Sequence, residues 1–95
     1  MRFDFSLRES PGSRVSYGVN FANEIQTNDS VLSAAVSVYD ESGVDVTSGT
    51  NPTVSVSGTI VTVMVTIPRS IYVRVVVTTS AGLIIVRTLY IRALS

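Results

Sequence analysis

The second half of the chain alternates between apolar and polar residues and is interrupted only by short turns. Val, Ile, Thr and Tyr dominate four runs, and these residue types favour a pleated, half-buried surface. The runs are Thr53 to Ser57, Thr59 to Ile67, Ile71 to Thr79 and Leu83 to Leu94. Because the turns between them leave no room for a helix, the pattern predicts four consecutive β-strands and a small all-β domain.

The first half repeats the period of two with longer interruptions. Three further strands are predicted at Arg2 to Arg8, Val15 to Phe21 and Ser30 to Tyr39. The residues expected to share the core face of the third strand are Leu32, Ala34, Val36 and Val38. Strands of this kind, about seven in all, predict an antiparallel β-sandwich with residues 11–95 as its single domain.

Turn residues separate these strands. Glu9 to Ser13 contain Pro and Gly, which are typical of a tight turn. Asn23 to Asp29 form a polar loop in which one helical turn is expected to bury Ile25. The polar connection from Val44 to Pro52 is predicted to carry a brief edge strand over residues 44–47.

The N-terminal segment, residues 1–10, has two interpretations. Phe3, Phe5 and Leu7 give it one apolar side, and the turn that follows separates it from the domain. We expect it either to fold back as the first strand of its own sandwich or to act as an arm that adds a strand to a neighbouring subunit.

Three short loops predict the register of the second half, because a slip of one residue would turn every side chain to the other face. The loops are a two-residue turn that begins with Gly58, a three-residue turn at 68–70, and a turn in which Gly82 is left-handed. All three are expected to join neighbouring strands as hairpins. The predicted cross-strand partners are Val56 with Val61, Val65 with Val73, and Val73 with Leu89.

This register has one cost, which is that Arg87 points to the apolar side. A register shifted by one residue would instead place Arg74 opposite Arg87, and like charges directly opposed are destabilising. We therefore expect Arg87 to lie at the rim of the sandwich or to reach a carboxylate.

The opposite face of the same strands is unusually apolar, whereas a solvated antiparallel face alternates to polar residues. Its apolar members are Ile60, Met64, Val76, Ile84, Val86 and Leu94. Either bulges and strands that switch between sheets turn some of these side chains inward, or a protein partner covers them.

Composition excludes several classes of protein. At 95 residues the chain is one domain, which buries only roughly 60 to 65% of its unfolded surface. It has no Cys for a disulfide framework, so oligomerisation is the remaining common route to stability and a homo-oligomer is expected. Without His or Cys the usual nucleophile pairs and zinc sites are missing. The sequence therefore predicts no enzyme, no cofactor, no metal site and no small-molecule substrate.

The net charge is zero, but the charges are separated along the chain. All seven acidic residues precede residue 46, and four of the seven arginines follow it. This predicts either that the two halves form facing or adjacent surfaces of one sandwich, or that subunits pair head to tail. Asp40, Glu41 and Asp45 are close in sequence but lack the spacing of a calcium loop.

Two strands carry similar motifs, Tyr72-Val73-Arg74 and Tyr90-Ile91-Arg92, which place two Tyr and two Arg on one face. Such a face resembles a stacking platform for single-stranded nucleic acid, yet a neutral chain lacks the basic footprint of those proteins. Cross-strand Tyr pairing and Arg at a protein contact are predicted instead. The predicted interface residues are Phe3, Phe5, Leu7, Met64, Tyr72, Arg74, Val76, Val86, Tyr90 and Arg92.

Four short motifs follow one another along the chain. They are Pro11 six residues before Tyr17, Gly18-Val19-Asn20-Phe21, Asn28-Asp29-Ser30-Val31-Leu32-Ser33, and Val77-Thr78-Thr79-Ser80-Ala81-Gly82. In this order and spacing they resemble a short family of tailed-bacteriophage proteins, over residues 9–94. This chain has Asn20 where that family typically has an acid and Asn28 where it has Gly, and the segment 40–53 does not align.

The resemblance implies an immunoglobulin-like sandwich and a virion structural protein. We expect a non-enzymatic bacteriophage subunit that is made in the host cytoplasm and resides in the virion, most specifically a capsid decoration (cement) protein. Its expected partners are other virion proteins such as the major capsid protein, with neither nucleic acid nor membrane among them. The alternative is a head-tail joining protein or a tail or fibre module that recognises a host surface ligand.

Overall fold

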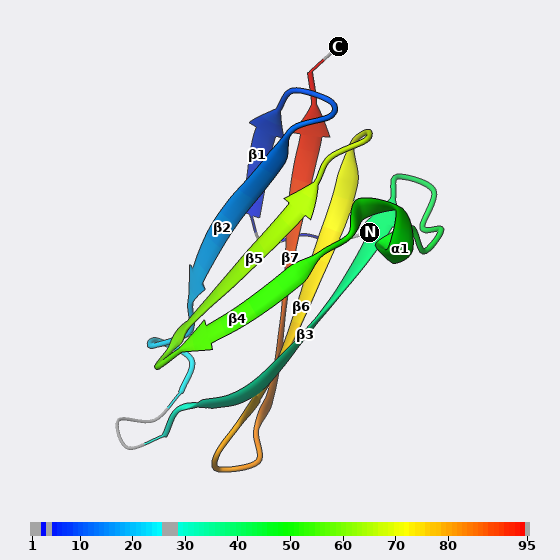
Figure 1. Ribbon diagram of the computed structural model, residues 1–95. Coiled ribbons are helices and arrows are strands. Elements are labelled where there is room, and N and C mark those ends of the chain that lie inside the picture. Colours follow the sequence, from blue (N-terminus) through cyan, green and yellow to red (C-terminus); the bar gives the residue numbers. More distant parts are fainter. Residues whose placement is uncertain (1–2, 4, 26–28, 95) are drawn as a thin grey trace.

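Seven strands in two sheets make up the structure, a computed structural model that describes residues 3, 5–25 and 29–94 (Figure 1). The strands are β1 (Phe5–Glu9), β2 (Arg14–Asn20), β3 (Val31–Asp40), β4 (Thr53–Ser57), β5 (Ile60–Thr66), β6 (Ile71–Thr79) and β7 (Ile84–Ala93). One helical turn, α1 (Thr47–Thr50), lies between β3 and β4. The predicted all-β sandwich is confirmed.

The larger sheet has the strand order β1-β7-β6-β3 and the smaller one the order β2-β5-β4. Except for β1, this is the strand order of an immunoglobulin-like sandwich, in which the second, fifth and fourth strands face the third, sixth and seventh. β1 joins β7 and runs parallel to it, so the expectation of a wholly antiparallel sandwich is wrong at this pair. Within the chain, Phe5–Glu9 is therefore a strand of its own sandwich, and residues 1, 2 and 4 lie outside the described part.

The core lies between the two sheets and is built from the residues that the alternation predicts. Its side chains that are at most 2% exposed include Val61, Val63 and Val65 of β5, Ile67 directly after β5, and Ile71, Val73, Val75 and Val77 of β6, together with Phe21, Val38 and Ile91. Each such side chain contributes about 1.5–3 kcal/mol through burial. Because residues one position apart point to opposite faces, the intervening side chains of β5 and β6 are left on the outer faces.

Two of the three predicted hairpins are confirmed. Val56 lies opposite Val61 in the β4–β5 pair, and Val73 lies opposite Leu89 in the β6–β7 pair. Gly82 at the β6–β7 turn has a φ of +88°, the left-handed conformation that glycine adopts without steric cost.

The third predicted hairpin, at residues 68–70, is wrong. β5 belongs to the smaller sheet and β6 to the larger one, so the connection crosses from one sheet to the other (Figure 1). Val65 and Val73, expected to be cross-strand neighbours, lie in different sheets and are both buried. A hairpin and a crossing between sheets bury the same alternate residues, so the hydrophobic pattern does not distinguish them.

A bulge in β3 alters its predicted core face. The register against β6 shifts between Val31 and Ser33, so that Val31 is 7% exposed while Leu32 is 69% exposed. The expected burial of Leu32 is therefore wrong. The predicted face holds from Ala34 onward and ends in Val38, which is fully buried.

The connection after β3 forms a single β-bridge and α1 where a brief edge strand was expected. Val38 donates its backbone N–H to Thr47 Oγ1 (2.9 Å) and accepts a hydrogen bond from the Val46 N–H (2.8 Å). These bonds satisfy backbone groups on the open edge of β3.

The loop before β3 is described only in part. Ile25 is half-buried after a turn at 22–24, whereas 26–28 lie outside the described residues. No helix in the described part is long and apolar enough to span a membrane.

The left-handed turn can be tested with a pair of glycine substitutions. Gly82→Ala should lower the free energy of unfolding by about 1 kcal/mol, because an L-residue is strained at a φ of +88°. Gly49→Ala is the matched control, since it lies in α1 and neither site has an atom within 4 Å of an added Cβ. The control should be neutral or slightly stabilising. Urea unfolding measures both, and an equal loss at the two sites would contradict the left-handed turn.

Asp29 joins the loop before β3 to the β6–β7 turn. Its Oδ1 accepts hydrogen bonds from the Ser80 hydroxyl and from the backbone N–H groups of Ser30 (2.8 Å) and Ala81 (3.0 Å). These bonds, that of the Ser80 hydroxyl above all, lower the pKa of Asp29 to about 2 from 3.8. A pKa lower in the folded state than in the unfolded state stabilises the protein above the unfolded pKa, and this stabilisation is lost as pH falls through the folded pKa.

Asp29→Asn should therefore flatten the acid branch of the stability profile. The native protein should lose stability between pH 4 and pH 2 as Asp29 becomes protonated, and the variant should lose less over the same interval. Ser80→Ala should weaken the same dependence, because it removes the largest cause of the low pKa. Urea unfolding at a series of pH values measures the slopes, and identical slopes in all three proteins would refute this account.

Candidate protein-binding face

Three tyrosines form a row across the outer face of the larger sheet. Tyr39 of β3 pairs with Tyr72 of β6, and Tyr72 pairs with Tyr90 of β7. Cross-strand partners project to the same side of a sheet, and the rings of Tyr72 and Tyr90 have centroids 4.9 Å apart. Phe3 packs on this pair, with its centroid 5.3 Å from that of Tyr90 and 6.2 Å from that of Tyr72. The predicted cross-strand Tyr pairing is confirmed.

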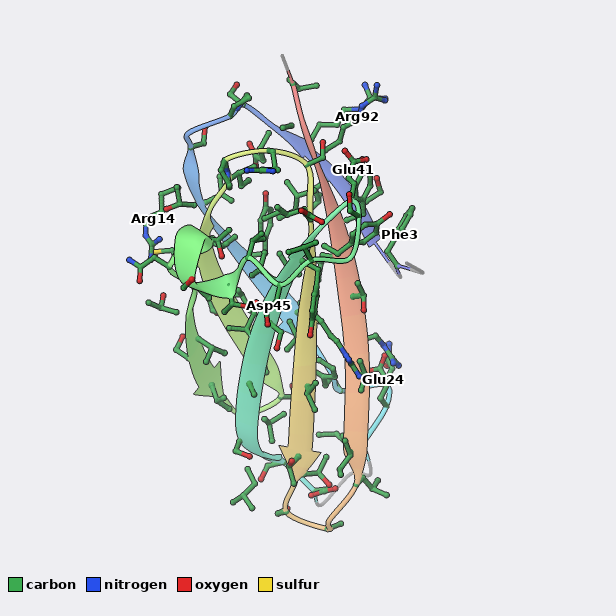
Figure 2. The ribbon with its side chains drawn as sticks, turned by 90° about the vertical axis from the view of Figure 1, so that its right-hand side faces the viewer. Phe3, Arg14, Glu24, Glu41, Asp45 and Arg92 are labelled. Atoms are coloured by element: carbon green, nitrogen blue, oxygen red, sulfur yellow. The ribbon has the colours of Figure 1, made fainter. Side chains whose placement is uncertain are left out.

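Glu41, in the turn after β3, contacts this row. The hydroxyl of Tyr90 donates a hydrogen bond to Glu41 Oε2 at 3.0 Å. Figure 2 shows Phe3, Glu41 and Arg92 at the same end of the larger sheet. Packed aromatic pairs contribute about 0.5–1.5 kcal/mol beyond their burial, so Phe3, Tyr72 and Tyr90 hold one another in place.

Arginines lie on both sides of this row along the strands. Arg74 is two residues beyond Tyr72 in β6, and Arg92 is two residues beyond Tyr90 in the opposite direction, because β6 and β7 are antiparallel. Arg8 of β1 is the register partner of Arg92. All three side chains are exposed.

The face continues past Arg74 with aliphatic residues. Val76 and Val86 are cross-strand partners and are half-buried, and Ile84 beyond them is 70% exposed. We call this surface the tyrosine face. It consists of Phe3, Arg8, Tyr39, Glu41, Tyr72, Arg74, Val76, Val86, Tyr90 and Arg92.

The structure brings together most of the predicted interface residues but separates two of them, Met64 and Leu7. Met64 lies on the outer face of the smaller sheet, on the opposite side of the sandwich, and is 41% exposed. Leu7 points inward and packs against the core. Phe5 begins β1, but its side chain lies outside the described part of the structure.

Tyr39 and Glu41 belong to this site and were not predicted. The period of two in β3 already places Tyr39 on the side opposite to the buried Val38. The missing information was the pairing of β3 with β6, which sets Tyr39 beside Tyr72. No local signal indicates that Glu41 meets Tyr90, because the two residues are 49 positions apart.

A second feature is a cleft of about 460 Å³ at the open side of the sandwich, between β2 and the β1–β7 pair. Residues 16–20 of β2 line it together with Leu7 and Leu89. The Phe21 N–H bonds to the Thr59 carbonyl of the neighbouring strand, and ladder bonds alternate along an antiparallel pair. The N–H and C=O groups of residues 16, 18 and 20 therefore point toward the cleft.

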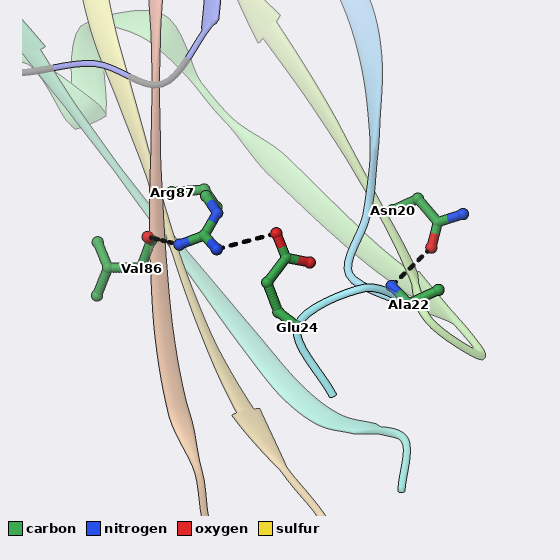
Figure 3. Close-up of polar contacts among 5 residues, drawn as sticks. All are labelled: Asn20, Ala22, Glu24, Val86 and Arg87. Atoms are coloured by element: carbon green, nitrogen blue, oxygen red, sulfur yellow. Dashed lines mark hydrogen bonds and ion pairs between the residues drawn. The ribbon is translucent and has the colours of Figure 1, made fainter. Parts of the chain in front are cut away.

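Arg87 closes the edge of β7 where β1 no longer covers it (Figure 3). Its guanidinium forms an ion pair with Glu24 at 2.9 Å and donates a hydrogen bond to the Val86 carbonyl at 2.8 Å. The expectation that Arg87 reaches a carboxylate is confirmed. An inward-pointing charge on an edge strand discourages pairing with another chain.

Acidic side chains of the β3 turn serve the backbone. Asp40 Oδ1 accepts hydrogen bonds from the N–H groups of Ser42 and Val44. Asp45 bonds to Thr47, which lowers the pKa of the Asp45 carboxyl. Within the described residues no three side chains of His, Cys, Asp or Glu are grouped so as to hold a metal ion.

No protein-family model matches this chain, and no curated protein matches it. The resemblance to tailed-bacteriophage proteins therefore stays a prediction. The tyrosine face and the cleft are the surfaces from which a function can be argued.

The edge-closing ion pair generates a double-mutant test. Glu24→Gln should lower the free energy of unfolding by about 1 kcal/mol, because Arg87 then stays half-buried without its carboxylate. Arg87→Gln should cost more, since the bond to the Val86 carbonyl is lost as well. The two changes should be non-additive by about 0.5–1 kcal/mol. Arg69→Gln, on an exposed loop, is the control and should be within about 0.5 kcal/mol of the native protein. Strict additivity in urea unfolding at low salt would show that the pair contributes nothing.

Proposed function

We propose that this chain is a non-enzymatic structural subunit of a virus particle that docks on another virion protein through the tyrosine face. The most specific form of the proposal is a capsid decoration subunit of a tailed bacteriophage, bound to the major capsid protein. The observation that carries the docking proposal is the row of Tyr39, Tyr72 and Tyr90, with arginines on both of its sides, on an outer sheet face.

The residue types of this face are those of protein interfaces. Tyr and Arg are enriched at interfaces and dominate their binding energy. A solvated antiparallel face would instead carry small polar or charged residues. The rings of Tyr72 and Tyr90 already pack on each other at an interplanar angle of 35°, so little side-chain entropy remains to be lost when a partner binds.

The particle assignment has a separate basis in the sequence. The ordered motifs between Pro11 and Gly82 resemble tailed-phage proteins, and a chain without His or Cys lacks the commonest catalytic groups. A host-recognising tail or fibre module would be expected to carry aromatic residues in its loops. In this chain all four tyrosines lie in strands, which favours docking through a sheet.

The proposal does not require a free N-terminal arm. The backbone of β1 pairs with β7 from Phe5 to Glu9, and the Leu94 N–H bonds to the Glu9 carbonyl at 2.8 Å. Phe3 packs on Tyr72 and Tyr90. In this arrangement Phe3 and Arg8 form part of the tyrosine face.

Charge substitutions on opposite sides of the sandwich test the docking face. Val76→Asp should weaken binding to the particle by at least about 100-fold while the thermal midpoint changes little, because Val76 is only half-buried and the substitution adds a buried charge to the apolar part of the interface. Met64→Asp places the same charge on the opposite face and should bind like the native protein. The measurement is co-sedimentation with virus particles purified without the protein.

Three results would count against the proposal. The first is that the native protein fails to sediment with particles. The second is that mass spectrometry of complete virions detects none of its peptides. The third is that Val76→Asp binds as tightly as Met64→Asp. The thermal midpoints of the variants separate lost docking from lost folding.

A further inference from the structure

We propose that the partner of the tyrosine face is an acidic protein surface, with carboxylates placed on both sides of an apolar centre. This inference rests on the proposed docking function and adds the chemistry of the partner. It follows from which charged side chains the fold neutralises and which it leaves without a counter-ion.

The acidic side chains of the described residues are all engaged within the chain. Hydrogen-bond donors to them are Tyr17 for Glu9, Arg87 for Glu24, Tyr90 for Glu41, and backbone N–H groups for Asp29, Asp40 and Asp45. Only one of these donors is an arginine. The separated charges of the sequence therefore meet across the sandwich at a single ion pair among the described residues.

Among the described residues, most of the arginines have no carboxylate as a counter-ion. Arg87 has Glu24, and Arg14 donates to the Asn51 carbonyl and to Thr66. The described residues place no carboxylate within ion-pair distance of the other four, which are Arg8, Arg69, Arg74 and Arg92. Three of these four belong to the tyrosine face, so positive charge is concentrated where the aromatic row lies.

Arg8 and Arg92 deepen this imbalance because they are register partners on adjacent strands. Like charges directly opposed in a sheet are unfavourable. A carboxylate from a partner would relieve the repulsion, and the planar guanidinium groups can bind it through two parallel hydrogen bonds.

The spacing of the arginines defines the partner further. Arg74 is at the level of Thr88 in β7, four residues from Arg92, which corresponds to about 14 Å along the strand. Tyr72 and Tyr90 lie midway between these levels. The complementary surface therefore carries two acidic positions about 14 Å apart with an apolar or aromatic residue between them.

The same face fits a nucleic acid less well. Tyr72, Tyr90 and Phe3 pack on one another, whereas a platform for single strands needs ring faces free to stack on bases. The net charge of zero gives the chain no overall attraction for a polyanion.

Peptide titrations test the inference with defined probes. The first probe is a peptide with the core Glu-Val-Tyr-Val-Glu, the second replaces both Glu by Gln, and the third is single-stranded oligo-dT. Amide chemical shifts of the native protein are followed by NMR. The acidic peptide should shift the amides of 72–76 and 86–92 and bind at least about tenfold more tightly than the Gln peptide at low salt, and added salt should weaken it. The double variant Arg74→Gln, Arg92→Gln should bind the acidic peptide no more tightly than the Gln peptide. Arg69→Gln, an equally unpaired arginine outside the face, should keep it.

Several outcomes would overturn the acidic partner. They are equal binding of the acidic and Gln peptides, no binding of the acidic peptide at millimolar concentration, or tighter binding of oligo-dT, which would indicate a nucleic-acid platform.

Particle co-sedimentation separates this inference from the proposed function. If Val76→Asp abolishes particle binding and the double Arg variant binds like the native protein, the docking face stands and the acidic partner is wrong. If Val76→Asp binds like the native protein, the docking function itself is wrong.

Discussion

The packing of β5 against β6 across the core is the interaction on which the rest of the structure depends. β5 is the central strand of the smaller sheet, and β6 lies between β7 and β3 in the larger one. The core-facing residues of both strands are almost completely removed from water, from Val61 to Ile67 and from Ile71 to Val77. Residues 68–70 join the two strands, so the pair that fills the core is also continuous in sequence. β2 and β4 pair with β5, and β3 and β7 pair with β6, while β1 is added to the larger sheet through β7.

The tyrosine face is a consequence of that packing. Ile71 and Val73 are held in the core, and a strand that buries every second residue must present the others on its outer face. Tyr72 therefore lies outside, and the pairings of β6 with β3 and β7 set Tyr39 and Tyr90 beside it. Folding does not bury these rings in the core, which leaves them available for a partner.

The edges of the sheets are closed by different means. Thr47 and Val46 bond to the backbone of Val38 at the edge of β3, while Arg87 occupies the uncovered edge of β7. Residues 16–20 of β2 line the cleft, and the Tyr17 hydroxyl donates a hydrogen bond to Glu9 of β1. A small domain without disulfides thus uses single side chains and one helical turn to limit edge-to-edge association.

Local patterns and tertiary packing determined different parts of this protein. Alternation and turn residues alone predicted the strands, the hairpin register of Val73 with Leu89, and the inward position of Arg87. Only the tertiary structure decided that 68–70 crosses between sheets, that Leu32 leaves the core at a bulge, and that the first strand runs parallel to the last. It also decided that Tyr39 and Glu41 join the tyrosine face. The alternation of apolar and polar residues predicts which side chains share a face, because that depends on the backbone geometry within one strand. Which strands become neighbours depends on the packing of side chains far apart in the chain, and no local pattern carries that information.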